Sequence, residues 1–376
     1  MNDSFASRWR SCGRLSILMA IALVGSCKYE SFVLPETTTA PKTYTIHELG
    51  VPAGGTQSQA NSGSATAVVG WGILTGTAHH AAAFAGGAAI MLQEPAGTTA
   101  SEARGVNDAG VVCGFAQIAG VRHAYIWPTA TATAVPVALP SLGGTYTFAR
   151  NINSSGVIAG ASQETAGDTV VVIWTPASGG GYTVERLHPL LGQNFGVAAI
   201  NNAGQVAGNQ PTGEGFLWDD DDGMINIDTP EGGDDDDGVD VNGMNNLGIV
   251  AGNYGDETTG DDRSFVYTGT SGAVPLGPPP TGYTGVAAGG LSDDGWVFAQ
   301  ATGVNSGGQA VGVAVVGTIV DSASTWTVLP SLTGTIASPQ DNAVNTCGVI
   351  FGYATKAASA TVRYAVAWVP QGCTIP

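Results

Sequence analysis

The stretch NINSSGVIAG, residues 151–160, decides the fold because variants of it recur along the chain. The copies share the phrase apolar-Asn-x-x-Gly-x-Val-x-Gly, and their anchor positions are spaced by 44 to 53 residues. The clearest copies are GVNDAGVVCG (105–114), NINSSGVIAG (151–160), AINNAGQVAG (199–208) and GMNNLGIVAG (243–252). Weaker copies are GLSDDGWVFA (290–299), AVNTCGVIFG (343–352) and a degenerate GSATAVVG (63–70). A fixed period of this length indicates a repeat architecture.

Each copy predicts one four-stranded antiparallel blade. Asn-x-x-Gly suits the turn of a first hairpin, because the Asn side chain bonds to turn backbone and Gly accepts positive φ. An apolar-aromatic segment follows, such as HAYIW (123–127) or VVVIW (170–174), and a fourth segment such as YTVERL (182–187) closes the unit. Four short strands in about 46 residues match a propeller blade. The sequence therefore predicts an all-β fold, a single seven-bladed β-propeller over residues 43–376.

The last repeat lacks its fourth strand, because the chain ends soon after the third. A segment with the character of a fourth strand, TYTIHEL (43–49), precedes the first repeat. We therefore expect this N-terminal strand to complete the last blade and close the ring, which removes exposed sheet edges.

The first 27 residues read as an export signal. Arg8, Arg10 and Arg14 precede the ten-residue apolar run 15–24, which is too short for an ordinary transmembrane helix. The run leads into LVGSC (23–27), which resembles a bacterial lipobox, so residues 1–27 are predicted to be a lipoprotein-type signal peptide with Cys27 as the lipid attachment site. The alternative is ordinary signal cleavage beside a chance cysteine. Residues 28–42, rich in Thr and Pro, are expected to form a flexible tether.

The composition restricts the partners. Of 376 residues only 12 are Lys or Arg against 30 Asp or Glu, giving a net charge of −18. Nucleic acid and anionic membrane surfaces are therefore not expected as partners, and the membrane is reached only through the lipid anchor. We expect an exported monomer, anchored as a periplasmic or cell-surface lipoprotein or alternatively secreted.

Two of the remaining cysteines are placed to pair. Cys347 falls in the turn between strands one and two of the last blade, and Cys373 follows strand three, so both emerge on the same face. A disulfide between them is predicted, as suits an oxidising compartment. Cys113 is expected to be a buried free thiol.

The phrases HAYIW (123–127), VALPSLGGTY (137–146) and N-x-x-G-x-V-x-G resemble the HAF-family extracellular repeat proteins of bacteria, named for a His-Ala-Phe signature. The signature is near-intact at His123-Ala124-Tyr125, with HHAAAF (79–84) as a looser echo, and several blades lack the His-Ala pair. The resemblance covers nearly all of the chain after residue 43. It implies an exported protein and carries no established activity, catalytic residue or cofactor.

Common hydrolase, zinc and nucleotide motifs do not occur in the sequence, and we predict no catalytic residue. His79 and His80 are adjacent, and neighbours on a strand point to opposite faces, so joint metal ligation is not favoured. The first strands of the repeats offer Arg104, Arg150 and Asp240 toward the propeller axis without a repeated carboxylate pair.

Acidic residues crowd three loops between 214 and 262. By strand alternation two of these loops emerge on one face from neighbouring blades, while 219–222 lies on the other. Closely spaced carboxylates repel unless a hard cation or basic partner neutralises them. A Ca²⁺ site is one hypothesis, drawn from Asp234, Asp235, Asp236, Asp237, Asp240, Asp256, Asp261 and Asp262. The alternative hypothesis is that these acidic loops are solvated and bind no cofactor, as runs of like charge usually are.

Three functions remain open at this point. The first is a surface-displayed module that binds a glycan, peptide or protein with the loops around the channel. The second is an envelope enzyme of lyase or glycoside hydrolase type, which needs inward-facing acids or histidines at one depth. The third is a passive structural protein of the envelope. The sequence favours a binding module over an enzyme.

Overall fold

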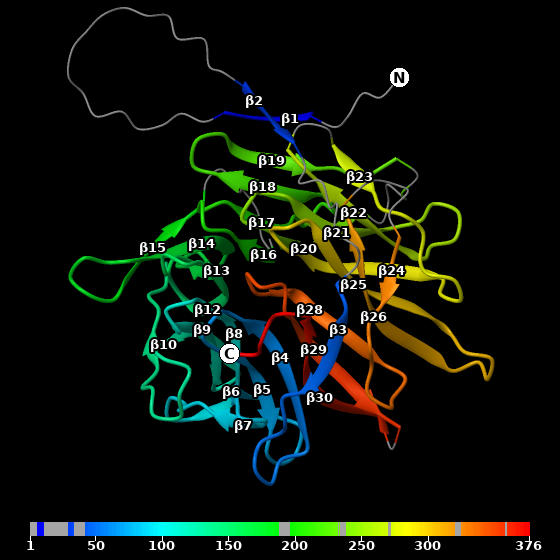
Figure 1. Cartoon of the computed structure of the whole chain (residues 1–376). Coiled ribbons are helices and arrows are strands. Elements are labelled where there is room, and N and C mark those ends of the chain that lie inside the picture. The colour runs from blue at the N-terminus through cyan, green and yellow to red at the C-terminus, as the bar shows by residue number, and fades with distance from the viewer. Residues whose placement is uncertain are drawn as a thin grey trace, which may run out of the picture.

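The computed structural model describes residues 6–10, 29–33, 42–187, 196–231, 233, 238–269, 272–319, 325–357 and 359–376. Seven four-stranded antiparallel sheets surround one axis as the blades of a propeller (Figure 1). The predicted all-β, seven-bladed fold is therefore confirmed. No helix in these described ranges is long and apolar enough to span a bilayer.

The first six blades each take four consecutive strands. Blade 1 has β4 (Gln57–Gly63), β5 (Val68–Ile73), β6 (His80–Ala85) and β7 (Ala88–Met91), and blade 2 has β8 (Thr98–Val106), β9 (Val112–Ile118), β10 (Val121–Trp127) and β11 (Val137–Ala138). Blade 3 has β12 (Gly143–Ile152), β13 (Ile158–Glu164), β14 (Thr169–Pro176) and β15 (Tyr182–Arg186), and blade 4 has β16 (Gly196–Ile200), β17 (Val206–Asn209), β18 (Gly215–Asp219) and β19 (Gly223–Ile227). Blade 5 has β20 (Val239–Met244), β21 (Val250–Gly255), β22 (Asp262–Tyr267) and β23 (Ala273–Pro275), and blade 6 has β24 (Gly285–Leu291), β25 (Trp296–Val304), β26 (Ala310–Thr318) and β27 (Thr327–Val328).

Blade 7 joins the two ends of the propeller. It consists of β28 (Ala337–Val344), β29 (Ile350–Lys356), β30 (Ser359–Pro370) and the N-terminal β3 (Tyr44–Glu48). Strand β3 pairs antiparallel with β30 from Tyr44 opposite Pro370 to Glu48 opposite Val366. The predicted closure by the N-terminal strand is confirmed. Outside the ring, β1 (Ala6–Arg10) pairs with β2 (Tyr29–Val33).

The repeated Asn links five of the seven blades to the blade that follows. Its Oδ1 accepts backbone N–H groups of its own turn, as Asn153 does from Ser155 and Val157. Its Nδ2 donates across to the backbone carbonyl at the anchor position of the following blade. These links, 3.0 to 3.4 Å long, join Asn107 to Asn153, Asn153 to Asn201, Asn201 to Asn245, Asn245 to Ser292 and Asn345 to Ser64. The Asn is thus both a turn cap and an inter-blade tie.

Steric constraints explain why both of these positions in the repeated phrase are glycine. The Gly in the turn has positive φ, for example +80° at Gly156. The final Gly lies beneath a β-bulge of the innermost strand. A Cβ added to Gly160 would lie 2.0 Å from the carbonyl oxygen of Phe148, and one on Gly114 would lie 2.1 Å from that of Glu102. No side chain fits there without moving the backbone.

The recurring Trp at the end of the third strand also ties blades together. The indole N–H groups of Trp127, Trp174 and Trp368 donate to backbone carbonyls that follow the preceding blade, each at 2.7 Å. All three side chains are fully buried. The Ala124 N–H of the His-Ala-Tyr signature likewise donates to Thr147 Oγ1 of the next blade at 2.7 Å. These signature positions hold the ring together.

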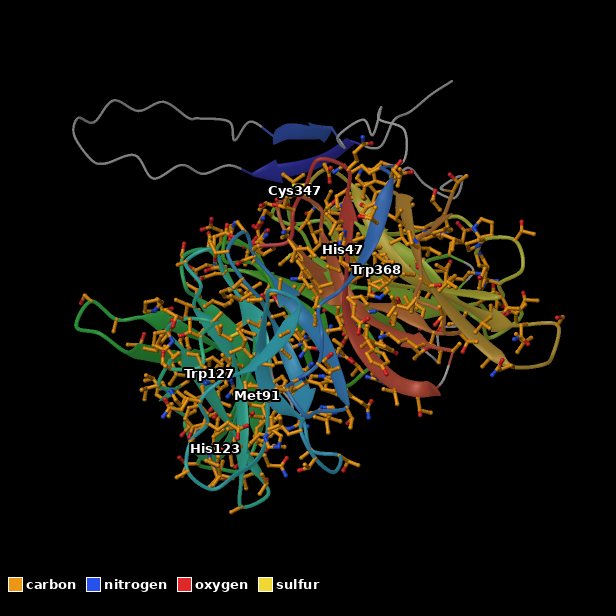
Figure 2. All side chains as sticks on the ribbon, turned by 60° about the horizontal axis from the view of Figure 1, so that its bottom comes forward. His47, Met91, His123, Trp127, Cys347 and Trp368 are labelled. Atoms are coloured by element: carbon orange, nitrogen blue, oxygen red, sulfur yellow. A yellow bond between two sulfur atoms is a disulfide. The ribbon has the colours of Figure 1, made fainter. Side chains whose placement is uncertain are left out.

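The antiparallel order gives the propeller two distinct faces. We call the face that carries the Asn-x-x-Gly turns the turn face, and the face where the innermost strands begin the entry face. Cys347 of the turn face and His123 of the entry face lie on opposite sides of the molecule (Figure 2). On the turn face a disulfide joins Cys347 to Cys373, whose Cα atoms are 6.1 Å apart. Cys113 is a buried free thiol, and burial raises its pKa to about 12.

Two details differ from the sequence-based expectation. In blade 1 the anchor position is Ser64 rather than Gly63, since Ser64 accepts the link from Asn345 and its N–H bonds to the Ala67 carbonyl. Strand β28 begins at Ala337, six residues before the expected start at Ala343. A polar, Pro-containing segment with a bulge conceals the alternation that marks a strand.

Replacing Asn153 by Ala tests the inter-blade tie. The substitution leaves two turn N–H groups and the Asn201 carbonyl without the partner that Asn153 supplies, which we expect to cost about 2–4 kcal/mol. The thermal unfolding midpoint should fall by several degrees. Ser154→Ala, an exposed position of the same turn, serves as the control and should change the midpoint little. Equal effects of the two substitutions would contradict the tie.

Candidate functional site

In the described part of the chain, one cavity lies near the propeller axis at each face. The turn-face cavity has a volume of about 130 Å³ and is lined by turn residues of several blades. The entry-face cavity has a volume of about 570 Å³, within the range of roughly 300–1,000 Å³ typical of small-molecule sites. Of these two cavities, the entry-face cavity is the one large enough for a ligand of several chemical groups.

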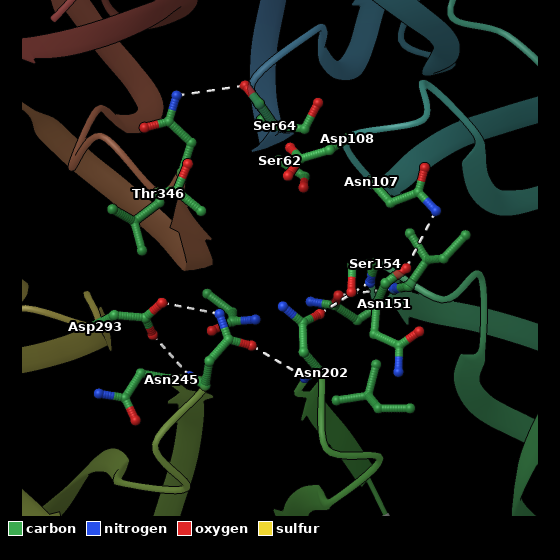
Figure 3. Close-up of a pocket in the computed structure, with 18 of the residues that line it drawn as sticks. Ser62, Ser64, Asn107, Asp108, Asn151, Ser154, Asn202, Asn245, Asp293 and Thr346 are labelled. Atoms are coloured by element: carbon green, nitrogen blue, oxygen red, sulfur yellow. Dashed lines mark hydrogen bonds between the residues drawn. The ribbon is translucent and has the colours of Figure 1, made fainter.

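Several polar side chains of the turn-face cavity hydrogen-bond to the neighbouring blade (Figure 3). In blades 2, 4, 5 and 6 the side chain of the residue after the anchor accepts a backbone N–H of the preceding blade. Asn202 Oδ1 accepts from Ser154 N at 2.9 Å, and Asp293 Oδ1 accepts from Asn246 N at 2.8 Å. Such residues form a second circle of inter-blade bonds, so this face serves the ring itself.

A bulge of blade 7 separates the two cavities. In β28 the four residues 340–343 face the single residue Phe351 of β29. The bulge crosses toward the other blades, where Asn342 Oδ1 accepts from Met244 N of blade 5 at 3.3 Å and Gln340 Oε1 accepts from Gln59 Nε2 of blade 1 at 2.7 Å. Gly290 of blade 6 allows this approach, since an added Cβ would lie 3.2 Å from the Asn342 Cα. The bulge of blade 7 thus reaches into the channel and contacts blades 1, 5 and 6.

Two arginines at one repeat position line the entry-face cavity. Arg104 and Arg150 each stand three residues before the anchor Asn of blades 2 and 3. Each is the extra residue of the β-bulge in its inner strand. The equivalent bulged residues of blades 1, 4, 5 and 6 are Asn61, Ala198, Asn242 and Gly289. A bulge re-aims its side chain, so the repeat presents one residue per blade and only two blades present a cation.

The two arginines have different carboxylate partners. Arg150 donates from a terminal nitrogen to Asp341 Oδ2 at 3.1 Å, across the channel from blade 3 to blade 7. The Nε atom of Arg104 lies 3.3 Å from Glu102 Oε2 and is buried without hydrogen-bond geometry to a partner. Burial lowers the pKa of Arg104, and the nearby Arg150 and Arg122 act in the same direction.

Glu102 is held by a second partner. His79 Nδ1 lies 2.9 Å from Glu102 Oε1, and the His79 ring stacks on Trp71 with centroids 3.7 Å apart. Burial would raise the pKa of Glu102, but the His79 hydrogen bond and the charges of Arg104 and Arg122 outweigh it, so the pKa is lowered. Glu102 is therefore a fixed anion that orients Arg104.

Aromatic side chains form the wall beside the arginines. Tyr146 and Phe148 alternate with Arg150 on β12, so all three reach the cavity from one strand. Phe148 lies 5.6 Å from the guanidinium carbons of both Arg104 and Arg122, measured to its ring centroid. The site thus combines cations with apolar ring surface, a lining suited to ligands that carry both an anionic and an apolar face.

Several predicted site residues lie elsewhere. Cys27 and Asp234–Asp237 are outside the described residues. Within the described ranges no three His, Cys, Asp or Glu side chains gather closely enough to hold a metal ion. Asp256 caps its own turn through Thr258 N and Thr259 N and faces Arg263 at 3.4 Å. The pKa of Asp262 is raised by burial and by the neighbouring Asp261 and Asp240.

The structure does not place the three first-strand residues noted in the sequence at one site. Arg104 and Arg150 meet at the cavity, whereas Asp240 is exposed on β20. His79 and His80 bond to different carboxylates, Glu102 and Glu94. Asp341, Tyr146 and Phe148 were not expected at the site. Alternation along β12 could have revealed the two aromatic residues, but the bulge that brings Asp341 across the channel has no signal in the sequence.

Comparison with known proteins supports the fold and leaves the family open. No protein-family model and no curated protein matches the chain. The β-propeller domain of the Trilobed protease from Pyrococcus furiosus is similar, with 9% identity, a TM-score of 0.53, and 85% of this chain and 96% of that chain covered. That propeller has an open velcro topology, whereas β3 closes blade 7 here.

Two further solved structures resemble the chain more loosely. The WD40 domain of SCAP from fission yeast has 10% identity and a TM-score of 0.44, with 88% of this chain and 98% of that chain covered. The polysaccharide lyase Uly1 has 10% identity and a TM-score of 0.42, with 93% of each chain covered. We base no conclusion about fold or function on these two looser likenesses.

Replacing Glu102 by Gln tests its role as a fixed anion. Because its pKa is lowered in the folded state, Glu102 stabilises the fold above its ordinary pKa and this contribution is lost as the pH falls through the folded pKa. The unfolding midpoint of Glu102→Gln should lie below that of the unaltered protein at pH 5.5, and the gap should narrow toward pH 3. Glu185→Gln, an exposed carboxylate on β15, is the control and should show no such trend. A gap that stays constant over this range would contradict the assignment.

Proposed function

We propose that the chain is an exported binding module that holds its ligand in the entry-face cavity. The observation that carries the proposal is the pair Arg104 and Arg150, placed by equivalent bulges of adjacent blades beside aromatic side chains. Nothing in the repeat requires a cation at this position, since other blades carry Asn, Ala or Gly there. A rare charge in a chain of net charge −18, repeated where it is not needed for folding, supports a role in recognition.

The lining supports binding over catalysis. Among the described residues that line the cavity, Asp341 is the one carboxylate, and it is paired with Arg150. Glycoside hydrolysis uses two carboxylates that flank the scissile bond. The described lining therefore does not supply the carboxylate pair of a glycoside hydrolase, which favours the binding module over that alternative. A lyase-type enzyme and a passive envelope protein are the remaining alternatives.

The export and anchoring belong to the same proposal. The leader of residues 1–27, the lipobox-like LVGSC and the HAF-type phrases together support a lipoprotein attached through Cys27 and displayed in the periplasm or at the cell surface. The Thr- and Pro-rich residues 28–42 would then separate the propeller from the membrane. A glycan, peptide or protein outside the cytoplasm is the corresponding ligand.

A pair of blocking substitutions tests the binding site. Gly196 lines the entry-face cavity, and among the described atoms a Cβ added there would meet only the Asn209 Cβ, at 3.9 Å, so Gly196→Trp fills that cavity. Thr346→Trp places the same side chain at the turn face and is the matched control. The protein is screened by fluorescence titration against neutral oligosaccharides, acidic oligosaccharides and peptides. We expect at least one set to bind, with loss in Gly196→Trp and retention in Thr346→Trp.

The other results are equally informative. Loss of binding in Thr346→Trp with retention in Gly196→Trp would move the site to the turn face and contradict the proposal. Failure of all three probe sets to bind would favour a passive envelope protein.

Calcium binding by the acidic loops of blades 4 and 5 is a separate proposal. Four of its eight residues are outside the described ranges, and the like charges around Asp262 support a need for neutralisation. Titration of chelator-treated protein with Ca²⁺ should raise the thermal unfolding midpoint until the site is saturated. At a hundredfold excess over Kd, the free energy of unfolding should increase by about 2.7 kcal/mol. Mg²⁺ is the control. No shift, or an equal shift with both ions, would leave the loops as solvated charge.

A further inference from the structure

The Asp341 carboxylate occupies the place that a ligand would take on Arg150. It reaches Arg150 from the blade-7 bulge, 191 residues away, and its side chain is 49% exposed, whereas Arg150 is 14% exposed. A guanidinium offers five N–H donors and prefers a bidentate carboxylate, but the bond to Asp341 uses one terminal nitrogen. Asp341 therefore occupies only part of the hydrogen-bonding capacity of the mostly buried Arg150 guanidinium, and the contact is open to solvent.

A second cation lies beside this pair. Arg104, at the equivalent bulge of blade 2, has a buried Nε outside hydrogen-bond geometry, and its charge acts on the same cavity. Glu102 balances Arg104, and Asp341 balances Arg150. An incoming carboxylate that displaced Asp341 would neutralise the positive charge of Arg150 in its place and would remain near Arg104. The arrangement favours one anionic group at this point in the cavity.

The rest of the lining indicates what carries that anion. Tyr146 and Phe148 present ring surface on the same strand as Arg150, and Gln163 and Thr169 add polar groups farther along the cavity. A sugar ring fits such a wall, because its C–H face can lie on an aromatic ring while its hydroxyl groups bond to polar side chains. The net charge of −18 repels a long polyanion elsewhere on the surface, so recognition is confined to a short segment.

We propose that the entry-face cavity binds a carboxylate-bearing sugar of an acidic glycan, and that Asp341 is an internal competitor which the sugar carboxylate displaces from Arg150. This inference rests on the proposed binding function and specifies its ligand. Arg150 and Arg104 are the recognition residues, Tyr146 and Phe148 form the wall, and Asp341 sets the affinity. Asp341 thereby keeps Arg150 paired when no ligand is present.

Calorimetric titration with hexuronate oligosaccharides at low salt tests this inference. Asp341→Asn removes the competing charge and should tighten binding by about three- to tenfold. Arg150→Gln should weaken it by about 30-fold or more, and Arg150→Lys, which keeps the charge without the fork, should restore only part of the loss. Arg263→Gln on blade 5 is the matched control and should leave the affinity within about twofold. Thermal unfolding of each variant confirms that it is folded.

Matched probes separate this inference from the binding function. A neutral oligosaccharide of equal length should bind at least about tenfold more weakly than the hexuronate. If the neutral oligosaccharide binds as tightly as the hexuronate and Gly196→Trp abolishes that binding, the proposed binding function is supported. The inference of carboxylate recognition is then wrong. If an acidic peptide binds in place of the hexuronate, the glycan class is wrong. Unchanged or weaker hexuronate binding by Asp341→Asn would refute the competitor role.

Discussion

The bulge in the innermost strand of each blade is the constraint on which the rest of the structure depends. It brings a backbone carbonyl onto the second strand so closely that Gly160 and Gly114 cannot carry a side chain. Directly after it, the anchor Asn caps the turn and bonds to the next blade. One short phrase thus fixes the hairpin, the spacing between blades and the direction of a single side chain into the channel.

This construction separates what the repeat requires from what it permits. The Asn and Gly positions are constrained by backbone geometry, while the bulged residue faces the channel and can vary. Where it is Asn61 or Asn242, its amide adds another inter-blade bond. Where it is Arg104 or Arg150, the charge must be balanced in a partly desolvated cavity, which costs free energy unless anions lie nearby. The departure from the repeat is therefore the informative part of the sequence.

Most of the fold follows from the sequence because its causes are local. The Asn-x-x-Gly turns, the buried Trp174 and the closing strand β3 each have a pattern that short-range geometry explains. The site is less predictable because it depends on contacts between distant repeats. Arg104 and Arg150 could be assigned to inner strands, but their meeting with Asp341 requires the four-residue bulge of β28, which the apolar alternation of a strand does not encode.

Blade 7 connects the closure of the ring with the chemistry of the site. Its outer strand β3 comes from the N-terminal side of the propeller, and the disulfide Cys347–Cys373 fastens its turn to the segment after β30. The innermost strand of the same blade carries Asp341 to Arg150 and Asn342 to blade 5. The strand that closes the ring and the anion that balances Arg150 therefore belong to the same four-stranded sheet. Blade 7 thus carries Asp341, whereas blades 2 and 3 carry Arg104 and Arg150. A change of the residue at position 341 would therefore alter the charge beside Arg150 without altering the blades that hold the arginines.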